Sequence, residues 1–508
     1  MAPFDPQNLP TDLLPPILAQ LTDRRDWHAC ALVSKVFNRV ASPLLYRTLD
    51  SRIVSKSLVH HPSTTLIKRP DLALHVRHVT ETGAIHRGLL PYHRDITANT
   101  LQALSLCHNL RSMTWVDDST TTDSILLAFL EVVRLLPMRE LTIRTHSDLG
   151  ETVWSQLVGL TGLRKISIWC MEGPPRVLQG WSGRLGSTLT HLELGRCAGV
   201  PPTILITVLS QLPLLKDLRL KGAPASAIPT ILTFLPNLQS LDTEYHISSP
   251  HAASAPAPRP FFPASPDSSS TYPPIPRVPA LKHLTLRTSS IDVMGPQKLW
   301  SWILSLVPLP GLCSFRLHCF TINEGHTIIP RMFILDLARI HSNTLRSFDV
   351  GEAQMTLNDV ECLCSKFKEI EEIGCSVSTS DVASIKSAIV NGKNLRKLTL
   401  QVQWPTALYA TGDRWSGGFS ADRWSHKRYQ KPKFALEDAT DMMLRFEGSK
   451  LRVLAVGNVV YTGKWILESE DGEGEGEEVK EVEEGEKRRD RRKLKFKVTT
   501  NVCEEKWV

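Results

Sequence analysis

The sequence lacks the long hydrophobic runs that a membrane-spanning helix needs. Its longest apolar runs, such as Ile125–Leu130 and Ile204–Leu209, fall far short of the 18 or so residues required. Residues 1–8 are polar and contain proline, unlike a secretory signal peptide. No Asn-x-Ser/Thr sequon occurs, and the ten cysteines are scattered without a disulfide-dense spacing. These absences predict a cytoplasmic or nuclear protein with no membrane partner.

Motifs that carry chemistry are also missing. Cys313 and Cys319, like Cys362 and Cys364, have no second pair of metal ligands nearby. The stretch 457–465 imitates a phosphate-binding loop, but it has one residue too many between its glycines and tryptophan in place of the metal-binding hydroxyl. No Gly-x-Ser-x-Gly elbow is present. We therefore expect no cofactor, no metal site and no catalytic residue, and we expect these cysteines to pack in the core.

A helical, apolar stretch opens the chain at residues 9–49. Leu13, Ile17, Leu18 and Leu21 recur at the three- and four-residue steps of one helix face. A second helical run is expected over residues 27–41, ended by the proline at position 43. About forty residues bury too little surface to be stable alone, so this segment needs a neighbouring domain or a partner.

Leu9-Pro10, the acidic Asp12, the leucines that follow and the sequences LVSKVFN and PLLYRTL resemble the F-box, especially that of fungal F-box proteins. The resemblance covers about forty of the 508 residues and departs from the usual pattern at Asp12 and at the double proline. It implies a module that docks on a Skp-type adaptor within a cullin-RING ubiquitin ligase. The residues that it implies for adaptor binding are Leu9, Pro10, Leu13, Ile17, Leu18, Leu21, Leu32, Val33 and Phe37.

An internal repeat fills most of the remaining chain. The pattern Leu-x-x-Leu-x-Leu, with other apolar residues replacing leucine, starts at Leu110, Met138, Leu163, Leu189, Leu215, Leu238, Leu281, Leu312, Leu345, Ile370, Leu395 and Leu451. Most steps lie close to the roughly 20–29 residues of a leucine-rich repeat. Helix-like runs separate the repeats, so the sequence predicts a curved, leucine-rich-repeat-like α/β solenoid over residues 110–467, with 51–109 as linker and cap. Within the cap, residues 75–80 alternate apolar and polar side chains, which predicts a half-buried strand.

Side chains that flank the inward leucines should point to the concave face of such a solenoid, because strand side chains alternate. This places seven residues there, and they suggest an acidic or phosphorylated target: Arg144, Lys165, Trp169, Arg219, Lys221, Arg287 and Arg316. A mixed, solvated sheet face is an equal alternative.

Two insertions and a charged tail interrupt the pattern. Residues 248–280 hold ten prolines and seven serines, and residues 403–436 are rich in tryptophan and tyrosine. Residues 468–508 form a charged tail that we expect to be disordered, with eleven acids in 468–486 and eight basic residues in 487–497. The basic run is a nuclear localisation signal, a nucleic-acid patch or a counter-charge to the acidic run.

The predicted fold is thus a small all-helical F-box, residues 1–50, followed by an α/β solenoid. The predicted function is that of a non-catalytic substrate-recognition subunit of an SCF-type ubiquitin ligase. Two alternatives stay open: a leucine-rich-repeat scaffold outside a ligase, and a nucleic-acid-associated protein that uses its basic tail. Nucleic acid is the less favoured partner.

Overall fold

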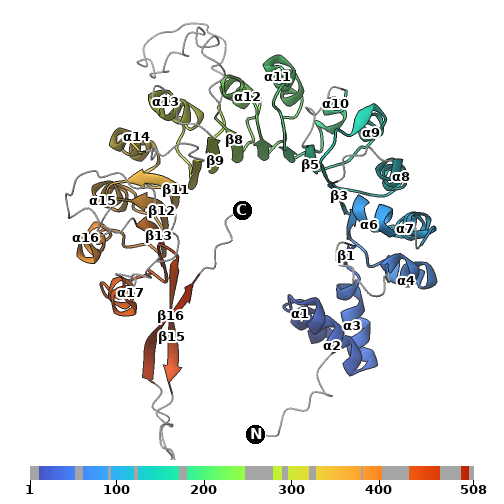
Figure 1. Ribbon diagram of the computed structural model, residues 1–508, viewed down its shortest axis with the longest axis horizontal. Coiled ribbons are helices and arrows are strands. Elements are labelled where there is room, and N and C mark those ends of the chain that lie inside the picture. The colour runs from blue at the N-terminus through green and yellow to red at the C-terminus, as the bar shows by residue number, and fades with distance from the viewer. Residues whose placement is uncertain are drawn as a thin grey trace, which may run out of the picture. The chain divides into compact units, whose positions relative to one another are not determined.

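The computed structural model describes residues 11–51, 61–89, 93–118, 124–170, 180–245, 278–288, 296–319, 328–378, 381–402, 434–468 and 493–502. The chain divides into two compact units, Met1–Leu281 and Lys282–Val508. Each unit has its own ladder of strands with helices between them (Figure 1). Both long insertions predicted from the sequence lie almost wholly outside the described residues.

Unit 1 begins with a small helical module made of η2 (Thr11–Leu13), α1 (Leu14–Leu18), α2 (Arg24–Val33) and α3 (Lys35–Leu45). The sequence predicted one helix over residues 27–41, and this was wrong. The chain turns extended at Ser34, whose hydroxyl accepts the backbone N–H of Phe37 and starts α3 as a new helix. Pro43 lies inside α3 rather than ending it, near the last turn, where its missing N–H removes only one hydrogen bond.

Eight parallel strands follow in unit 1, paired in chain order from β1 to β8. Their bounds are β1 Thr48–Asp50, β2 His78–Thr82, β3 Ser112–Asp117, β4 Glu140–Thr145, β5 Lys165–Cys170, β6 His191–Leu194, β7 Asp217–Leu220 and β8 Ser240–Glu244. The helices between them are α4 Pro62–Lys68, α5 Pro70–Ala73, α6 Gly83–Leu89, α7 Ile96–Ser105, α8 Ser124–Val133, α9 Gly150–Val158, α10 Ser182–Leu185, α11 Pro202–Ser210, η3 Ala225–Ala227 and α12 Ile228–Thr233. Within this unit the strands line the inner side of a curved array and the helices its outer side (Figure 1).

Unit 2 continues the same alternation and ends in a hairpin. Its strands are β9 His283–Thr288, β10 Ser314–Cys319, β11 Ser347–Met355, β12 Glu372–Val377, β13 Lys397–Val402, β14 Val453–Val456, β15 Val459–Glu468 and β16 Lys493–Val502. Its helices are α13 Pro296–Leu306, α14 Arg331–His341, α15 Leu357–Lys366, α16 Val382–Ala388 and α17 Leu436–Met443. Strands β9 to β14 pair in parallel, whereas β14–β15 and β15–β16 are antiparallel.

The predicted repeat is confirmed. Each of the strands β3 to β14 begins two residues after one of the predicted repeat starts. The leucines of the pattern are buried because each contacts the same position of the neighbouring repeats, as Leu141, Ile166 and Leu192 do in register. The core of each unit therefore lies between its strand ladder and its helices.

A second, polar contact between repeats was not predicted. The residue just before the first leucine of a repeat is often Asn or Thr, and its side chain donates a hydrogen bond to a carbonyl of the preceding repeat. Examples are Asn237 to Pro213 O (2.9 Å), Asn394 to Lys368 O (2.9 Å), Thr188 to Leu163 O (2.9 Å) and Thr344 to Leu312 O (2.9 Å). These bonds satisfy loop carbonyls that the parallel ladder leaves unpaired.

The ladder is longer than the leucine pattern at both ends. β1 and β2 join it before Leu110, so residues 51–109, which we expected to be linker and cap, supply a strand of the sheet. Residues 493–502, which we expected to lie in a disordered tail, form β16 along the whole of β15. None of the strands β1, β2 and β16 carries the leucine repeat. Short alternating segments become strands here because a neighbouring strand offers its free backbone groups. No helix in the described part of the chain is long and apolar enough to cross a membrane.

Candidate functional site

The helical module has a small core of its own. Leu18, Ala31 and Ala41 are buried in it, and they pack against the partly buried Leu21, Cys30, Phe37, Val40, Leu44 and Leu45. The indole Nε1 of Trp27 donates to the Leu18 carbonyl (2.9 Å), and Asn38 Nδ2 donates to the Ala31 carbonyl (3.0 Å). These contacts tie the three helices together.

The same helices also carry apolar side chains on their outer surface. On η2 and α1, Leu14 and Leu18 point inward while Leu13 and Ile17 are 48% and 49% exposed. At the junction of α2 and α3 the exposed fractions are 73% for Leu32, 66% for Val33 and 45% for Val36. A helix that is apolar on both sides is typical of a helix that is covered on both sides. The inner side is covered by the module itself, so the outer side is a candidate surface for a partner.

The nine adaptor-binding residues implied by the resemblance therefore separate into three groups. The first group, Leu13, Ile17, Leu32 and Val33, is exposed. The second group, Leu18, Leu21 and Phe37, lies in or against the core of the module, so Leu18 in particular has no surface to offer a partner. Leu9 and Pro10 lie outside the described residues. Val36 is exposed like the first group and was not among the nine, although its place in the apolar run LVSKVF was a signal for it.

A buried polar cluster lies beside the first strands of unit 1. Glu81 at the end of β2 contacts His61 Nε2 (3.5 Å) and His86 Nε2 (3.3 Å), and all three side chains are at least nine-tenths buried. Burial alone would raise the pKa of Glu81, but its contacts with His61 and His86 outweigh burial and lower it below its usual value. The His86 ring stacks on Trp115, with ring centroids 6.1 Å apart. This cluster is closed to a ligand and acts as a polar cross-link.

The strand face of unit 1 presents three rows of outward side chains, set by the strand register. The amino-end row is Glu140, Lys165, His191, Asp217 and Ser240, and the middle row is Thr142, Ser167, Glu193, Arg219 and Asp242. The carboxyl-end row is Val116, Arg144, Trp169, Gly195 and Lys221. The last two members extend the ladder beyond β6 and β7, because their amides donate to the carbonyls of the preceding strands (2.8 and 3.0 Å).

The charge of Arg219 in the middle row is compensated by acids of the middle and amino-end rows. Arg219 Nε lies 3.3 Å from Asp217 Oδ1. Burial lowers the pKa of Arg219, but its hydrogen bond to Asp217 and the charges of Asp217, Glu193 and Asp242 outweigh burial and raise it above its usual value. Arg219, which the sequence placed on a target-binding surface, is thus held among acidic neighbours.

The carboxyl-end row contains an exposed Arg and Lys on either side of an aromatic ring. The Trp169 indole lies across Gly195, where a Cβ atom would be 2.6 Å from Trp169 Cε3. Lys221 Nζ reaches over the same ring, 5.2 Å from its centroid, in a cation–π contact. Only glycine at position 195 leaves room for this arrangement, and the contact between Trp169 and Lys221 was not predicted from the sequence.

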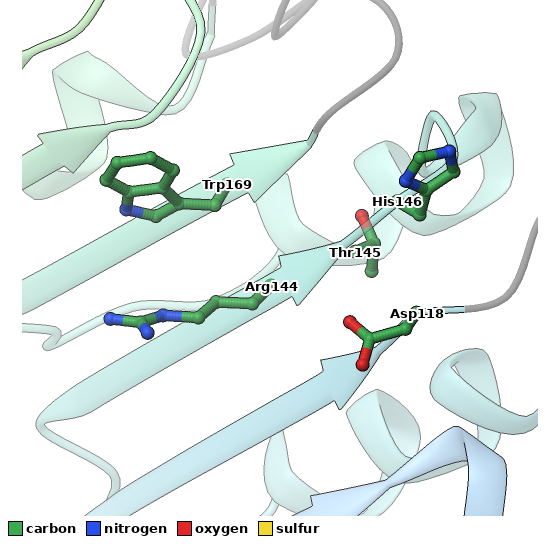
Figure 2. A pocket seen from close by; sticks show the side chains of 5 residues that line it. All are labelled: Asp118, Arg144, Thr145, His146 and Trp169. Atoms are coloured by element: carbon green, nitrogen blue, oxygen red, sulfur yellow. The ribbon is translucent and has the colours of Figure 1, made fainter. Parts of the chain in front are cut away.

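A cavity of about 400 Å³ lies beside this ring and is lined by Asp118, Arg144, Thr145, His146 and Trp169 (Figure 2). Arg144 and Trp169 are register partners on β4 and β5, and Asp118 follows the end of β3. We call the cavity together with Lys221 the Trp169 pocket. Five of the seven residues predicted for target binding, all in unit 1, thus lie on one strand face, and three of them form this pocket.

The other two predicted residues lie in unit 2. Arg287 is half-buried on β9, and Arg316 on β10 has its Nε 3.6 Å from Asp349 Oδ2. Neither adds to the pocket described for unit 1.

Most cysteines in the described part of the chain are buried. Burial raises the pKa of the thiols of Cys107, Cys197, Cys364 and Cys375 to about 12, so they are protonated and poor nucleophiles. Cys319, Cys362 and Cys364 pack in the core, which confirms the prediction for them, whereas Cys313 is partly exposed. Across the described ranges no group of three His, Cys, Asp or Glu side chains is placed to hold a metal ion. The stretch 457–465, which imitates a phosphate-binding loop, forms a turn that leads into β15, whereas a phosphate-binding loop leads into a helix.

Comparison with known proteins bears on the helical module at the start of unit 1. A family model described as F-box-like matches residues 6–52. No curated protein matches. The solved structures that the chain is similar to include the yeast Rad7–Elc1 complex, with a TM-score of 0.40 and 14% identity over 77% of this chain and 88% of that one.

Two further similar structures are a complex of TLR13 with ssRNA13 and a leucine-rich-repeat protein of Leptospira interrogans. The first has a TM-score of 0.34 and 12% identity over 70% of this chain and 48% of that one. The second has a TM-score of 0.26 and 14% identity over 66% of this chain and 87% of that one. At these TM-scores the likenesses say nothing about function. The sequence match and the described helices together establish that the chain carries an N-terminal F-box-like domain, followed by strands and helices in a leucine-rich-repeat-like solenoid.

Proposed function

We propose that the protein is a non-catalytic substrate-recognition subunit of an SCF-type ubiquitin ligase. Its F-box-like domain docks on a Skp-type adaptor held by a cullin, and its solenoid binds a target protein. Such a subunit accelerates ubiquitin transfer by raising the local concentration of the target, without supplying a reacting group. The protein then works in the cytoplasm, the nucleus or both.

One observation carries this proposal. The F-box-like domain has a complete inner core and yet exposes Leu13, Ile17, Leu32, Val33 and Val36 on the outside. Apolar side chains at a protein interface contribute most when a partner desolvates them fully. A domain that served only as the cap of the solenoid would bury its apolar side chains on the repeats rather than present them to solvent.

The test is capture of the adaptor by purified full-length chain. The double substitution Leu32→Asp, Val33→Asp should reduce capture of a Skp-type adaptor and its cullin more than tenfold, because each substitution places a charge in the apolar interface. The matched control is Leu135→Asp, since Leu135 is 82% exposed but lies after α8, far along the chain from the F-box-like domain.

Both variants should keep the circular-dichroism spectrum and melting temperature of the wild type, because the three side chains are exposed. Undiminished capture by the double variant would reject the proposed docking surface. If the wild type itself captures neither adaptor nor cullin, the chain is a leucine-rich-repeat scaffold that acts outside a ligase.

A further inference from the structure

We propose that the Trp169 pocket binds an anionic side chain on a segment of the target protein. This inference rests on the proposed function, because it assumes that the strand face of unit 1 receives a target. It narrows the predicted recognition surface from seven residues to three: Arg144, Trp169 and Lys221.

The polar groups of these three side chains are all hydrogen-bond donors. Arg144 is exposed and, within the described residues, has no hydrogen bond or ion pair. Lys221 contributes an ammonium over the ring. The Trp169 Nε1–H is buried and has no acceptor among the described residues, and Figure 2 shows it on the edge of the indole nearer Arg144. The exposed guanidinium and ammonium, one from each side of the indole, fit a ligand that offers only acceptors, namely a carboxylate or a phosphate.

The other cations of the strand face are less suited to this role. Arg219 is hydrogen-bonded to Asp217 and surrounded by acids. Lys165 is the register neighbour of Glu140 in the amino-end row. In the carboxyl-end row the register neighbours of Arg144 are Val116 and Trp169, which carry no charge. The positive charge that a ligand can use is therefore concentrated beside Trp169.

Acidic groups near the pocket fix where the anion can lie. Asp118 lines the cavity from the β3 side, and Arg144 lies between it and Trp169 (Figure 2). Glu244 is the next outward residue beyond Lys221, but its carboxylate is buried and accepts the Gly222 N–H (2.7 Å). Lys221 extends away from it, toward Trp169. The anionic group is thus expected at the Trp169 end of the cavity, with the apolar part of the segment against the indole.

A rival occupant of the same cavity is a basic side chain, held by Asp118 and by the face of Trp169. The two occupants predict opposite effects at position 118. For an anionic ligand, Asp118→Asn removes a repulsion and keeps or strengthens binding, whereas for a cationic ligand it removes the counter-charge and weakens binding.

The experiment measures retention of short synthetic peptide pools on purified full-length protein. The pools have random flanking positions and a central phosphoserine, glutamate, serine or lysine. We expect the wild type to retain the phosphoserine or glutamate pool over the serine and lysine pools. Arg144→Glu and Lys221→Glu should each weaken that retention about tenfold, which is about 1.4 kcal/mol. Lys165→Glu is the matched control and should leave the preference in place.

Several outcomes would overturn the inference. These are equal retention of the glutamate, phosphoserine and lysine pools, an equal loss in the Lys165→Glu control, and a loss of binding in Asp118→Asn. Stronger retention of a short single-stranded RNA pool than of any peptide pool would also overturn it, and would assign the pocket to nucleic acid. The phosphoserine and glutamate pools separate a phosphorylated target from an acidic one. Adaptor capture is measured on the same samples, so a failure of the pocket is distinguished from a failure of the F-box surface.

Discussion

Replacing Glu81 by glutamine is expected to destabilise the first strands of unit 1 by about 3 kcal/mol. Glutamine has the shape of glutamate but no charge, so the substitution tests the electrostatic part of the cluster alone. Glu81 is 3% exposed and lies 3.3 Å from His86 Nε2 and 3.5 Å from His61 Nε2. The Glu81 carboxylate is shielded from solvent, so its charge is stabilised by these two rings instead of by water.

The magnitude follows from these contacts. A hydrogen bond to a charged group contributes about 1.5–3 kcal/mol. His86 Nε2 makes one such contact at 3.3 Å, and the contact with His61 at 3.5 Å is long for a hydrogen bond, so the sum lies near about 3 kcal/mol. His86 also packs on Trp115 and against the edge of Phe129 (centroids 5.2 Å apart), and the substitution leaves these ring contacts in place.

The effect should depend on pH with a definite sign. The pKa of Glu81 in the folded protein lies below its usual value. A carboxylate whose folded pKa is lowered stabilises the protein above its unfolded pKa and loses this contribution as the pH falls through the folded value. The difference in stability between wild type and Glu81→Gln therefore shrinks as the pH falls through the folded pKa of Glu81.

The assay is native-state hydrogen exchange of peptides that cover β2 and β3 in the full-length chain. The free energy of opening β2 and β3 is lower by about 3 kcal/mol in the variant, so these amides should exchange roughly a hundredfold faster than in the wild type. Glu151→Gln is the control, because Glu151 is exposed on α9 and its carboxylate has no buried partner. Exchange in Glu81→Gln at the wild-type rate near neutral pH would refute the view that the cluster is a stabilising cross-link.

Two further predictions concern contacts between repeats. Gly195→Ala should displace the Trp169 ring and end its contact with Lys221, so tryptophan fluorescence shifts and stability falls by about 1–2 kcal/mol; an unchanged spectrum would contradict the close approach. Asn394→Ala should lower stability by about 1 kcal/mol, because it removes the hydrogen bond that the side chain donates to the carbonyl of Lys368. Chemical denaturation measures this loss, and a free energy of unfolding equal to that of the wild type would show that water replaces the amide.

Much of the fold was predictable because its signals are local. The leucine spacing placed twelve strands, each beginning two residues after a predicted repeat start. The strands without that pattern, β1, β2 and β16, were only partly anticipated, since they depend on a neighbouring strand for their hydrogen bonds. Apolar spacing alone predicted one continuous helix over residues 27–41, but in the structure Ser34 ends α2 and begins α3.

The sequence by itself determined the order of parts: an F-box-like stretch, then repeats whose leucines must be buried. Only the tertiary structure decided which side chains remain available to partners. It turned Leu18 inward and Leu32 outward, and it paired Arg219 with acids while leaving Arg144 exposed beside Trp169. The physical reason is that burial along one helix or strand follows a short period, whereas the charge and cover of a side chain depend on residues of the next repeat, about 25 positions away.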